Sequence, residues 1–229
     1  TEMLASRAHA DKLRATIDPL RATPTPSVAK TMREGTETTQ YSVVDAAGNA
    51  VSTTTTLNSL FGSKVFVTGG GFFLNDEMDD FSAGAGHPNM FGLIEGEANA
   101  IAPGKRMLSA MSPTIVLDPA GKVFLVIGAR GGPRIITSTA QVILNVIENH
   151  MSLSDAMNAP RIHHQALPDT LRIDDGGFEP AVTTQLERMG YTLQPQGYIG
   201  GSTVAIRRVP HGWEGMDDPR GYLGGAVGY

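Results

Sequence analysis

The change of pattern at Thr38 constrains the fold of this chain more than any other feature. Residues 19–37 contain three prolines and almost no apolar periodicity, which predicts a linker or a mobile tail. Directly after it, residues 39–45 and 50–57 are rich in β-branched and aromatic residues, and an Ala-Ala-Gly-Asn turn separates them. A β-hairpin therefore opens the main domain.

The rest of the chain shows strands and helices in blocks. A helix is expected at 3–17, a long surface loop at 82–106, and a glycine-rich, irregular tail from 210 to Tyr229. Hairpins followed by helices and then a further strand predict an α+β layered domain and not a βαβ parallel fold. The other expected elements are short strands at 65–67 and 72–74, a hairpin of 114–117 and 123–127, helices at 136–147, 153–157 and 180–189, and a strand at 203–209.

Composition argues against several classes of function. The net charge of −5 is spread without long basic blocks, which argues against binding to nucleic acid. No apolar run of about 18 residues is present, so no membrane span is expected in this chain. The absence of cysteine excludes disulfides, thiolate metal sites and cysteine nucleophiles, and it leaves the compartment open.

Thr38 is a candidate nucleophile if the bond before it is cut. An N-terminal threonine combines a hydroxyl with an α-amine of reference pKa about 7.7 to 8.0, so one residue can supply nucleophile and general base. While Thr38 is amide-bonded to Glu37, its nitrogen has no basic lone pair, and cleavage and activity are therefore linked. The alternative, two plain β-forming threonines at 38 and 39, stays open on the pattern alone.

Residues 75–81 place four acidic side chains within five positions. Repulsion between these carboxylates favours a cation beside them. The candidates are a metal ion, an ammonium group on a substrate, or solvent together with Lys64. A calcium loop needs a central glycine that this segment lacks, so a metal is disfavoured and no cofactor is expected.

Gly131-Gly132 follows a predicted strand and precedes a helix that starts near Arg134. Two N–H groups at such a position can bind an anion at the helix N-terminus or form an oxyanion hole, and the same pair is also common as a simple turn. His163-His164 lacks a partner at i, i+4 spacing and is interpreted as structural or surface-exposed. Trp213 carries no functional signal.

Seven segments, in order along the chain, form a recognisable set: Thr38 to Asp45, Thr56-Leu57-Asn58, Asn75 to Phe81, Leu108 to Thr114, Gly131 to Thr137, Ala159-Pro160-Arg161 and Asp218-Pro219-Arg220. Together they resemble the γ-glutamyltranspeptidases, N-terminal-nucleophile (Ntn) hydrolases whose precursors cut themselves into a large and a small subunit. The resemblance implies an Ntn-hydrolase type αββα sandwich of the α+β class, partial here and completed by the large subunit. It assigns 1–37 to the end of the large subunit with its linker, 38–229 to the small-subunit catalytic domain, and the cut to Glu37–Thr38.

The same resemblance assigns catalytic roles. Thr38 is similar to the family's nucleophile, which also acts as base through its freed amine. Thr56 is similar to the threonine that orients the nucleophile. The N–H groups of Gly131 and Gly132 would form the oxyanion hole.

Substrate-binding roles follow in the same way. Asn58, Glu77 and Asp80 fall at positions that hold the substrate's α-ammonium, and Ser109 matches a residue that binds the α-carboxylate. Residues 82–92, including Phe91 where many members have tyrosine, look like the lid over the pocket.

The sequence departs from the family pattern at several positions. Gln40 stands where the family usually has histidine. Ala110 replaces a second serine, which removes a hydroxyl from carboxylate recognition, a loss of about 0.5 to 1.5 kcal/mol. Pro133 replaces the residue, commonly serine, after the glycine pair. The arginine that completes carboxylate binding in the family belongs to the large subunit.

Three functional hypotheses follow. The first is a γ-glutamyl hydrolase or transferase that cleaves γ-glutamyl amides such as glutathione through a γ-glutamyl-threonine ester, with the large subunit of the same precursor as partner and a periplasmic or secreted location. The second keeps the nucleophile and changes the acyl group, as in cephalosporin or glutaryl acylases and poly-γ-glutamate enzymes, and Ala110 motivates it. The third is an unprocessed homologue that only binds amino acids or partners.

Overall fold

The computed structural model describes residues 3, 6–23, 38–82, 84, 87, 89, 93, 96–221 and 224–228. Most of the expected linker and most of the expected lid, including Phe91, lie outside the described residues, and so does Glu37.

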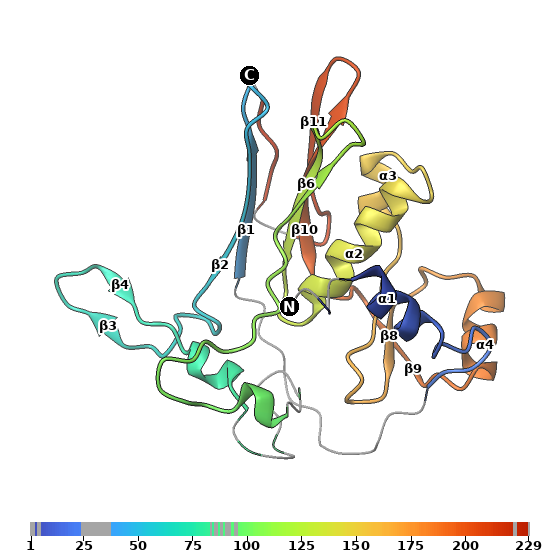
Figure 1. Ribbon diagram of the computed structural model, residues 1–229, viewed down its shortest axis with the longest axis horizontal. Helices are drawn as coiled ribbons and strands as arrows, with labels where there is room; N and C mark the ends of the chain where they lie inside the picture. The colour runs from blue at the N-terminus through green and yellow to red at the C-terminus, as the bar shows by residue number, and fades with distance from the viewer. Residues whose placement is uncertain are drawn as a thin grey trace.

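Three layers make up the main body (Figure 1). The middle layer is an antiparallel sheet of order β11-β10-β6-β5. The two-stranded sheet β1–β2 packs on one side of it, and helices α2 and α3 lie on the other. The α+β prediction is confirmed. The bounds are β1 (Thr38–Val44), β2 (Ala50–Thr56), β5 (Thr114–Leu117), β6 (Val123–Arg130), α2 (Arg134–Ile147), α3 (Leu153–Asn158), β10 (Ser202–Val209) and β11 (Gly212–Asp217).

The hydrophobic core lies between the four-stranded sheet and the two helices. β6 is apolar on both faces because it is covered on both, by α2 on one side and by β1–β2 on the other. The apolar stripe of α2 faces the sheet and leaves Ile136 and Leu144 outside. The buried cluster consists of Leu125, Ile127, Val142, Val146, Leu153, Ala156, Met157 and Ala205.

Smaller elements surround this body. The β3–β4 hairpin projects on the side of β1 and β2, and a sheet of order β7-β8-β9 lies beside α4 (Figure 1). The described part of the chain contains no helix long and apolar enough to cross a membrane. The bounds are α1 (Arg7–Arg14), β3 (Phe66–Val67), β4 (Phe72–Phe73), the 3-10 helices η1 (Glu77–Asp80) and η2 (Glu97–Asn99), β7 (Ile162–His163), β8 (Leu171–Asp174), α4 (Pro180–Arg188) and β9 (Leu193–Gln196).

The sequence-based prediction was wrong at the tail. Residues 212–217 form β11, which pairs with β10 along its whole length and is not irregular. Strands β7, β8 and β9 were not expected. The N-terminal helix is shorter than expected, because Ser6 caps it by accepting the N–H of His9 and Ala15 ends it.

Two segments that suggested the family meet in a buried ion network. Arg161 Nη1 donates to Asp218 Oδ2 at 2.6 Å, and both side chains are almost fully buried. Arg220 Nη2 donates to Asp174 Oδ2 at 2.6 Å and Nη1 to Asp218 Oδ1 at 3.3 Å. Thr203 donates its N–H and its hydroxyl to the same Asp218 oxygen that Arg161 contacts. Two positive and two negative side chains therefore balance one another inside the protein.

Candidate active site

The β1–β2 hairpin places the predicted nucleophile beside the threonine predicted to orient it. Thr38 is the first residue of β1 and pairs with Thr56, the last residue of β2. The Thr38 hydroxyl donates to Thr56 Oγ1 at 3.1 Å, and the Asn58 N–H donates to the same oxygen at 2.9 Å. Directly opposite residues of antiparallel strands lie close enough for this contact. The end of the hairpin therefore fixes both hydroxyls.

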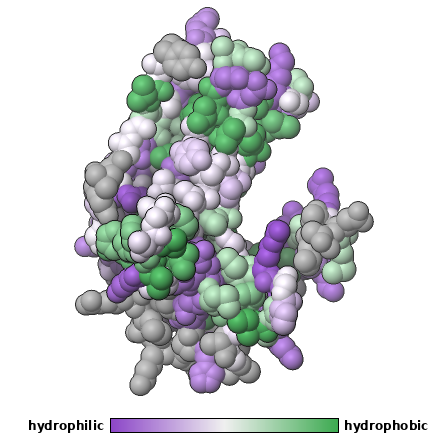
Figure 2. Space-filling view, turned by 90° about the vertical axis from the view of Figure 1, so that its left-hand side faces the viewer, coloured by the Kyte–Doolittle hydropathy of each residue, from purple (hydrophilic) through white to green (hydrophobic). Residues whose placement is uncertain are grey.

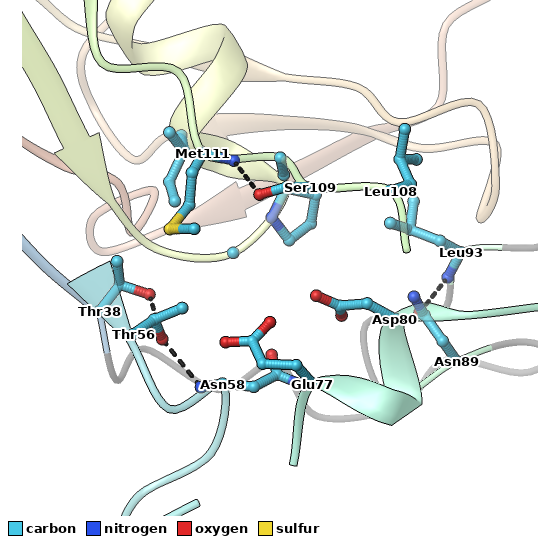
Figure 3. A pocket seen from close by; sticks show the side chains of 14 residues that line it. Thr38, Thr56, Asn58, Glu77, Asp80, Asn89, Leu93, Leu108, Ser109 and Met111 are labelled. Carbon is cyan, nitrogen blue, oxygen red and sulfur yellow. Dashed lines mark hydrogen bonds between the residues drawn. The ribbon is translucent and has the colours of Figure 1, made fainter. Parts of the chain in front are cut away.

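These threonines open onto a pocket that contains every predicted site residue except Gly131 (Figure 3). The described residues enclose about 50 Å³ in it. The pocket is lined by Thr38, Thr56, Asn58, Glu77, Asp80, Asn89, Leu93, Leu108, Ser109, Ala110, Met111, Gly132, Pro133 and Ile135.

The 3-10 helix η1 turns two carboxylates toward this space. Glu77 and Asp80 are three residues apart, and side chains at i and i+3 of a 3-10 helix lie on the same side. Figure 3 shows both carboxylates pointing from η1 into the pocket, toward the side where Thr38 and Thr56 lie. Asp79 is exposed and does not line the pocket.

Burial raises the pKa of the Glu77 carboxyl above its usual value. A hydrogen bond with Asp80 opposes the rise, and the negative charge of Asp76 adds to it. A carboxylate pair in this state binds a cation favourably, because the cation relieves both the desolvation and the repulsion. Among the residues the structure describes, no group of three or more potential ligands could hold a metal ion.

Asn58 is buried at the foot of the pocket with a left-handed backbone, φ 73°. Asparagine adopts this conformation more readily than most residues. Asn58 lies just after the end of β2, and the chain returns beside it after the β3–β4 hairpin, where the Asp76 N–H donates to Leu57 O at 3.1 Å. This contact holds the start of η1 next to the threonine pair.

Ser109 lies on the opposite wall. Its hydroxyl oxygen accepts the N–H of Met111 at 3.2 Å, so its hydrogen can be directed toward an anion in the pocket. The neighbouring Ala110 also lines the pocket and brings no hydroxyl. Its carbonyl accepts the hydroxyl of Ser112 at 2.9 Å, which holds this segment in place.

The glycine pair connects β6 to α2 with left-handed backbone, φ 126° at Gly131 and 59° at Gly132. A Cβ on Gly131 would overlap the backbone of Gly201, so this position needs glycine. Gly132 reaches the pocket, and neither glycine N–H donates a hydrogen bond to any other described residue. The N–H of Gly132, which lines the pocket just before α2, is therefore available to an anion there.

Sequence reasoning missed several pocket residues. Leu108 and Met111 flank Ser109 and Ala110, and this adjacency was a usable signal. Asn89 falls within the expected lid, 82–92, but was not singled out there; it is buried, and its side chain accepts the N–H of Leu93 at 3.0 Å. His163 is buried, with Nδ1 at 2.9 Å from Thr137 Oγ1, which confirms a structural role.

Comparison with known proteins agrees with this geometry. The family model for gamma-glutamyltranspeptidase matches residues 1–228. The glutathione hydrolase proenzyme of Pseudomonas aeruginosa is 49% identical over 222 residues, 95% of this chain and 39% of that proenzyme. The chain spans about two-fifths of the length of the curated relatives it matches.

Solved structures give the same result. The γ-glutamyltranspeptidase of Pseudomonas nitroreducens in complex with L-DON is 51% identical, with a TM-score of 0.76 over 83% of this chain and 100% of that chain. A mutant γ-glutamyltranspeptidase of Helicobacter pylori is 50% identical, with a TM-score of 0.76 over 80% of this chain and 100% of that one. These matches confirm the Ntn-hydrolase type of fold. The chain belongs to the γ-glutamyltranspeptidase family.

Proposed function

We propose that this chain carries the nucleophile of a γ-glutamyl hydrolase or transferase that cleaves γ-glutamyl amides such as glutathione. The observation that carries the proposal is the carboxylate pair Glu77 and Asp80, which faces the same pocket as Thr38. A γ-glutamyl group bears an α-ammonium at the end opposite its reacting carbonyl, and such a cation suits this pair. The similarity to glutathione hydrolase proenzymes agrees with it.

The reaction begins with cleavage of the Glu37–Thr38 bond, which frees the Thr38 α-amine. Thr38 Oγ then attacks the γ-carbonyl while the amine accepts its proton, and Thr56 orients the hydroxyl. The N–H groups of Gly131 and Gly132 stabilise the oxyanion. The leaving amine takes the proton, an ester forms on Thr38, and water or an acceptor amino acid releases the γ-glutamyl group.

The large subunit of the same precursor is the proposed partner. The described residues line a pocket of about 50 Å³, and this chain spans only about two-fifths of the length of the proenzymes that it matches. A further wall, with a cation for the α-carboxylate beside Ser109, is expected from that subunit. By analogy with the family, we also propose a periplasmic or secreted location, which cell fractionation tests.

The experiment uses the full-length protein and a chromogenic γ-glutamyl anilide. Thr38→Ala should abolish product release, and unchanged release would refute the role of Thr38. Intact mass measured on the same samples should show a species that begins at Thr38 in the wild type. A single stable chain without activity would favour the uncut, non-catalytic homologue.

An acylase with a different acyl group is the second candidate, and Ala110 favours it because it removes a hydroxyl from the pocket wall. Glutaryl and γ-glutamyl amides share the carboxylate and differ in the ammonium. Comparing kcat/KM for the two therefore separates the candidates. A strong preference for γ-glutamyl counts against the acylase, and equal rates would count against a role for the carboxylate pair.

A further inference from the structure

The face of the β1–β2 hairpin that meets β6 is mostly polar. Side chains alternate between the two faces of a strand, so Thr38, Gln40 and Ser42 share this face with Ser52, Thr54 and Thr56 of β2. The opposite face bears Tyr41, Val43 and Val51. Hydrogen bonds therefore replace much of the apolar packing where the hairpin meets the sheet.

Gln40 lies at the centre of this polar face and is 8% exposed. Its Nε2 donates to Ser52 Oγ at 3.0 Å and to Tyr41 O at 3.1 Å, and its Oε1 accepts the Thr54 hydroxyl. The Tyr41 carbonyl can only accept, which fixes the amide with nitrogen on that side. Both amide hydrogens and one lone pair are thus committed.

The contact continues to β6. Ser52 donates its single hydroxyl hydrogen to Ile127 O at 2.9 Å, so it accepts from Gln40 and donates to the sheet. Gly128 lies directly under the amide, and a Cβ there would overlap all three amide heavy atoms. The close approach of Gln40 to the β6 backbone therefore requires glycine at 128.

The hydrogen bonds from Gln40 through Ser52 to Ile127 O, called the relay below, join the β1–β2 hairpin to strand β6. β1–β2 and β6 belong to different sheets and share no backbone ladder. Gln40 is two residues from Thr38, about 7 Å along the strand. Ile127 lies within β6, five residues before Gly132 in the sequence. These hydrogen bonds thus connect the strand that begins at Thr38 with the strand that ends just before Gly131-Gly132.

We propose that Gln40 is a positioning residue, which holds the Thr38 nucleophile at a fixed distance from the Gly131-Gly132 donors through Ser52 and Ile127. The proposal rests on the proposed function, since it assumes that Thr38 reacts. Gln40 itself does not line the pocket onto which Thr38 opens. Its effect falls on kcat, because small misplacements of reacting groups slow the chemical step without weakening binding of the ground state.

The test is Gln40→Met in the full-length protein, which keeps the side-chain length over Gly128 and removes the hydrogen bonds. Activity is measured with the γ-glutamyl anilide per molecule that begins at Thr38, counted by intact mass. We expect kcat to fall by about 10- to 100-fold with KM within about twofold of wild type. The matched control is Ser42→Ala on the same face, whose buried hydroxyl bonds to no described residue; its kcat should stay within about twofold.

Two further variants keep the result decisive. Ser52→Ala breaks the relay with Gln40 in place, so it should lower kcat similarly, and the double variant should be no worse than either single one. Gln40→Glu should recover kcat relative to wild type as pH falls, because a protonated carboxyl regains a hydrogen to donate.

If Gln40→Met fails to fold, Ser52→Ala carries the test. Wild-type kcat in either variant, or a change confined to KM, would overturn the proposal. An inactive wild type would instead reject the function itself.

Discussion

Glu77 is a pocket carboxylate whose pKa is raised by burial. Glu77→Gln removes a charge-assisted contact to an ammonium group, which is typically worth about 1.5 to 3 kcal/mol. We expect KM for a γ-glutamyl anilide to rise by about tenfold or more, while a glutaryl anilide, which lacks the ammonium, changes little. Steady-state kinetics on both substrates checks this. Asp79→Asn is the matched control, since Asp79 lies on the same short helix and outside the pocket.

The raised pKa of Glu77 also predicts how stability depends on pH. For an acid whose pKa is higher in the folded than in the unfolded protein, ionisation opposes folding. This opposition is complete above the folded pKa and disappears as the pH falls below the ordinary value for glutamate. Burial is the first cause of the raised pKa of Glu77, the charge of Asp76 raises it further, and a hydrogen bond with Asp80 lowers it. Without substrate, Glu77→Gln should therefore raise Tm at pH 7 and make no difference near pH 4. A lower Tm at pH 7 would contradict the assignment.

Ala110→Ser restores a hydroxyl beside Ser109 on the pocket wall. One added hydrogen bond to the α-carboxylate should improve kcat/KM for γ-glutamyl anilide by about 2- to 10-fold. A 4-aminobutyryl anilide carries the ammonium and lacks the carboxylate, so its kcat/KM should stay unchanged. Equal gains on both substrates would show that the hydroxyl acts elsewhere.

At the level of residues, the sequence predicted which side chains line the pocket better than it predicted the hydrogen bonds between strands. Thr38 and Thr56 were paired by resemblance, and strand register explains why they touch. The relay through Gln40 was not foreseen, because it depends on a sheet-to-sheet contact between positions 40, 52 and 127. No spacing rule along one strand encodes such a contact.

Elements with a strong local pattern were predicted well. The hairpins of β1–β2 and β5–β6 and the helices α2, α3 and α4 lie close to where periodicity and turn residues placed them. β11 was missed because Gly212 and Gly215 interrupt its pattern, and pairing with β10 forms it. β8 was missed because Arg172 and Asp174 look exposed in the sequence and are buried in the structure, where Asp174 pairs with Arg220. β9 was missed because Pro195 interrupts it, and its parallel pairing with β8 forms it.

The outer face of the β1–β2 hairpin is not covered by any other element of the described structure. Tyr41, Val43 and Val51 are 49%, 53% and 50% exposed there. Figure 2, seen from the side of β1, β2 and the β3–β4 hairpin, shows hydrophobic residues at the surface. A two-stranded hairpin is marginal alone, and an αββα sandwich places a helix layer over this face. The proposed large subunit would supply that layer.

Val43→Lys should therefore weaken the processed complex of the two subunits. A lysine at the centre of this face would have to bury its charge or keep the partner away. Size-exclusion chromatography should show free small subunit, and the complex should have a lower Tm. Leu144→Lys on the outer face of α2, at 53% exposure and on the other side of the central sheet, is the control and should leave the complex intact. A stable Val43→Lys complex would place the subunit contact elsewhere.

Across the whole molecule, the ion network ties the last part of the chain to its middle. Asp218 is 1% exposed and accepts from Arg161, Arg220 and both donors of Thr203. Breaking a buried, balanced pair leaves an uncompensated charge, which typically destabilises by about 3 to 5 kcal/mol. Asp218→Asn should lower the Tm at pH 7 by on the order of 10 °C. Asp169→Asn, which removes an exposed contact to His164, should change it little.

The pH dependence of the Tm difference between wild type and Asp218→Asn gives a stricter test of the ion network. Burial alone would raise the pKa of the Asp218 carboxyl, but the charge of Arg161 and the backbone donors of Thr203 and Arg220 outweigh it, and the pKa lies below its usual 3.8. For an acid with a lowered folded pKa, the stabilisation is complete above the unfolded value and is lost as the pH falls through the folded one. Thermal unfolding should therefore show a gap between wild type and Asp218→Asn that is constant from pH 7 to about 5 and narrows below about 4. A gap that stays constant down to pH 3 would mean that the carboxylate's charge contributes nothing, and that packing alone joins residues 218–220 to the end of α3.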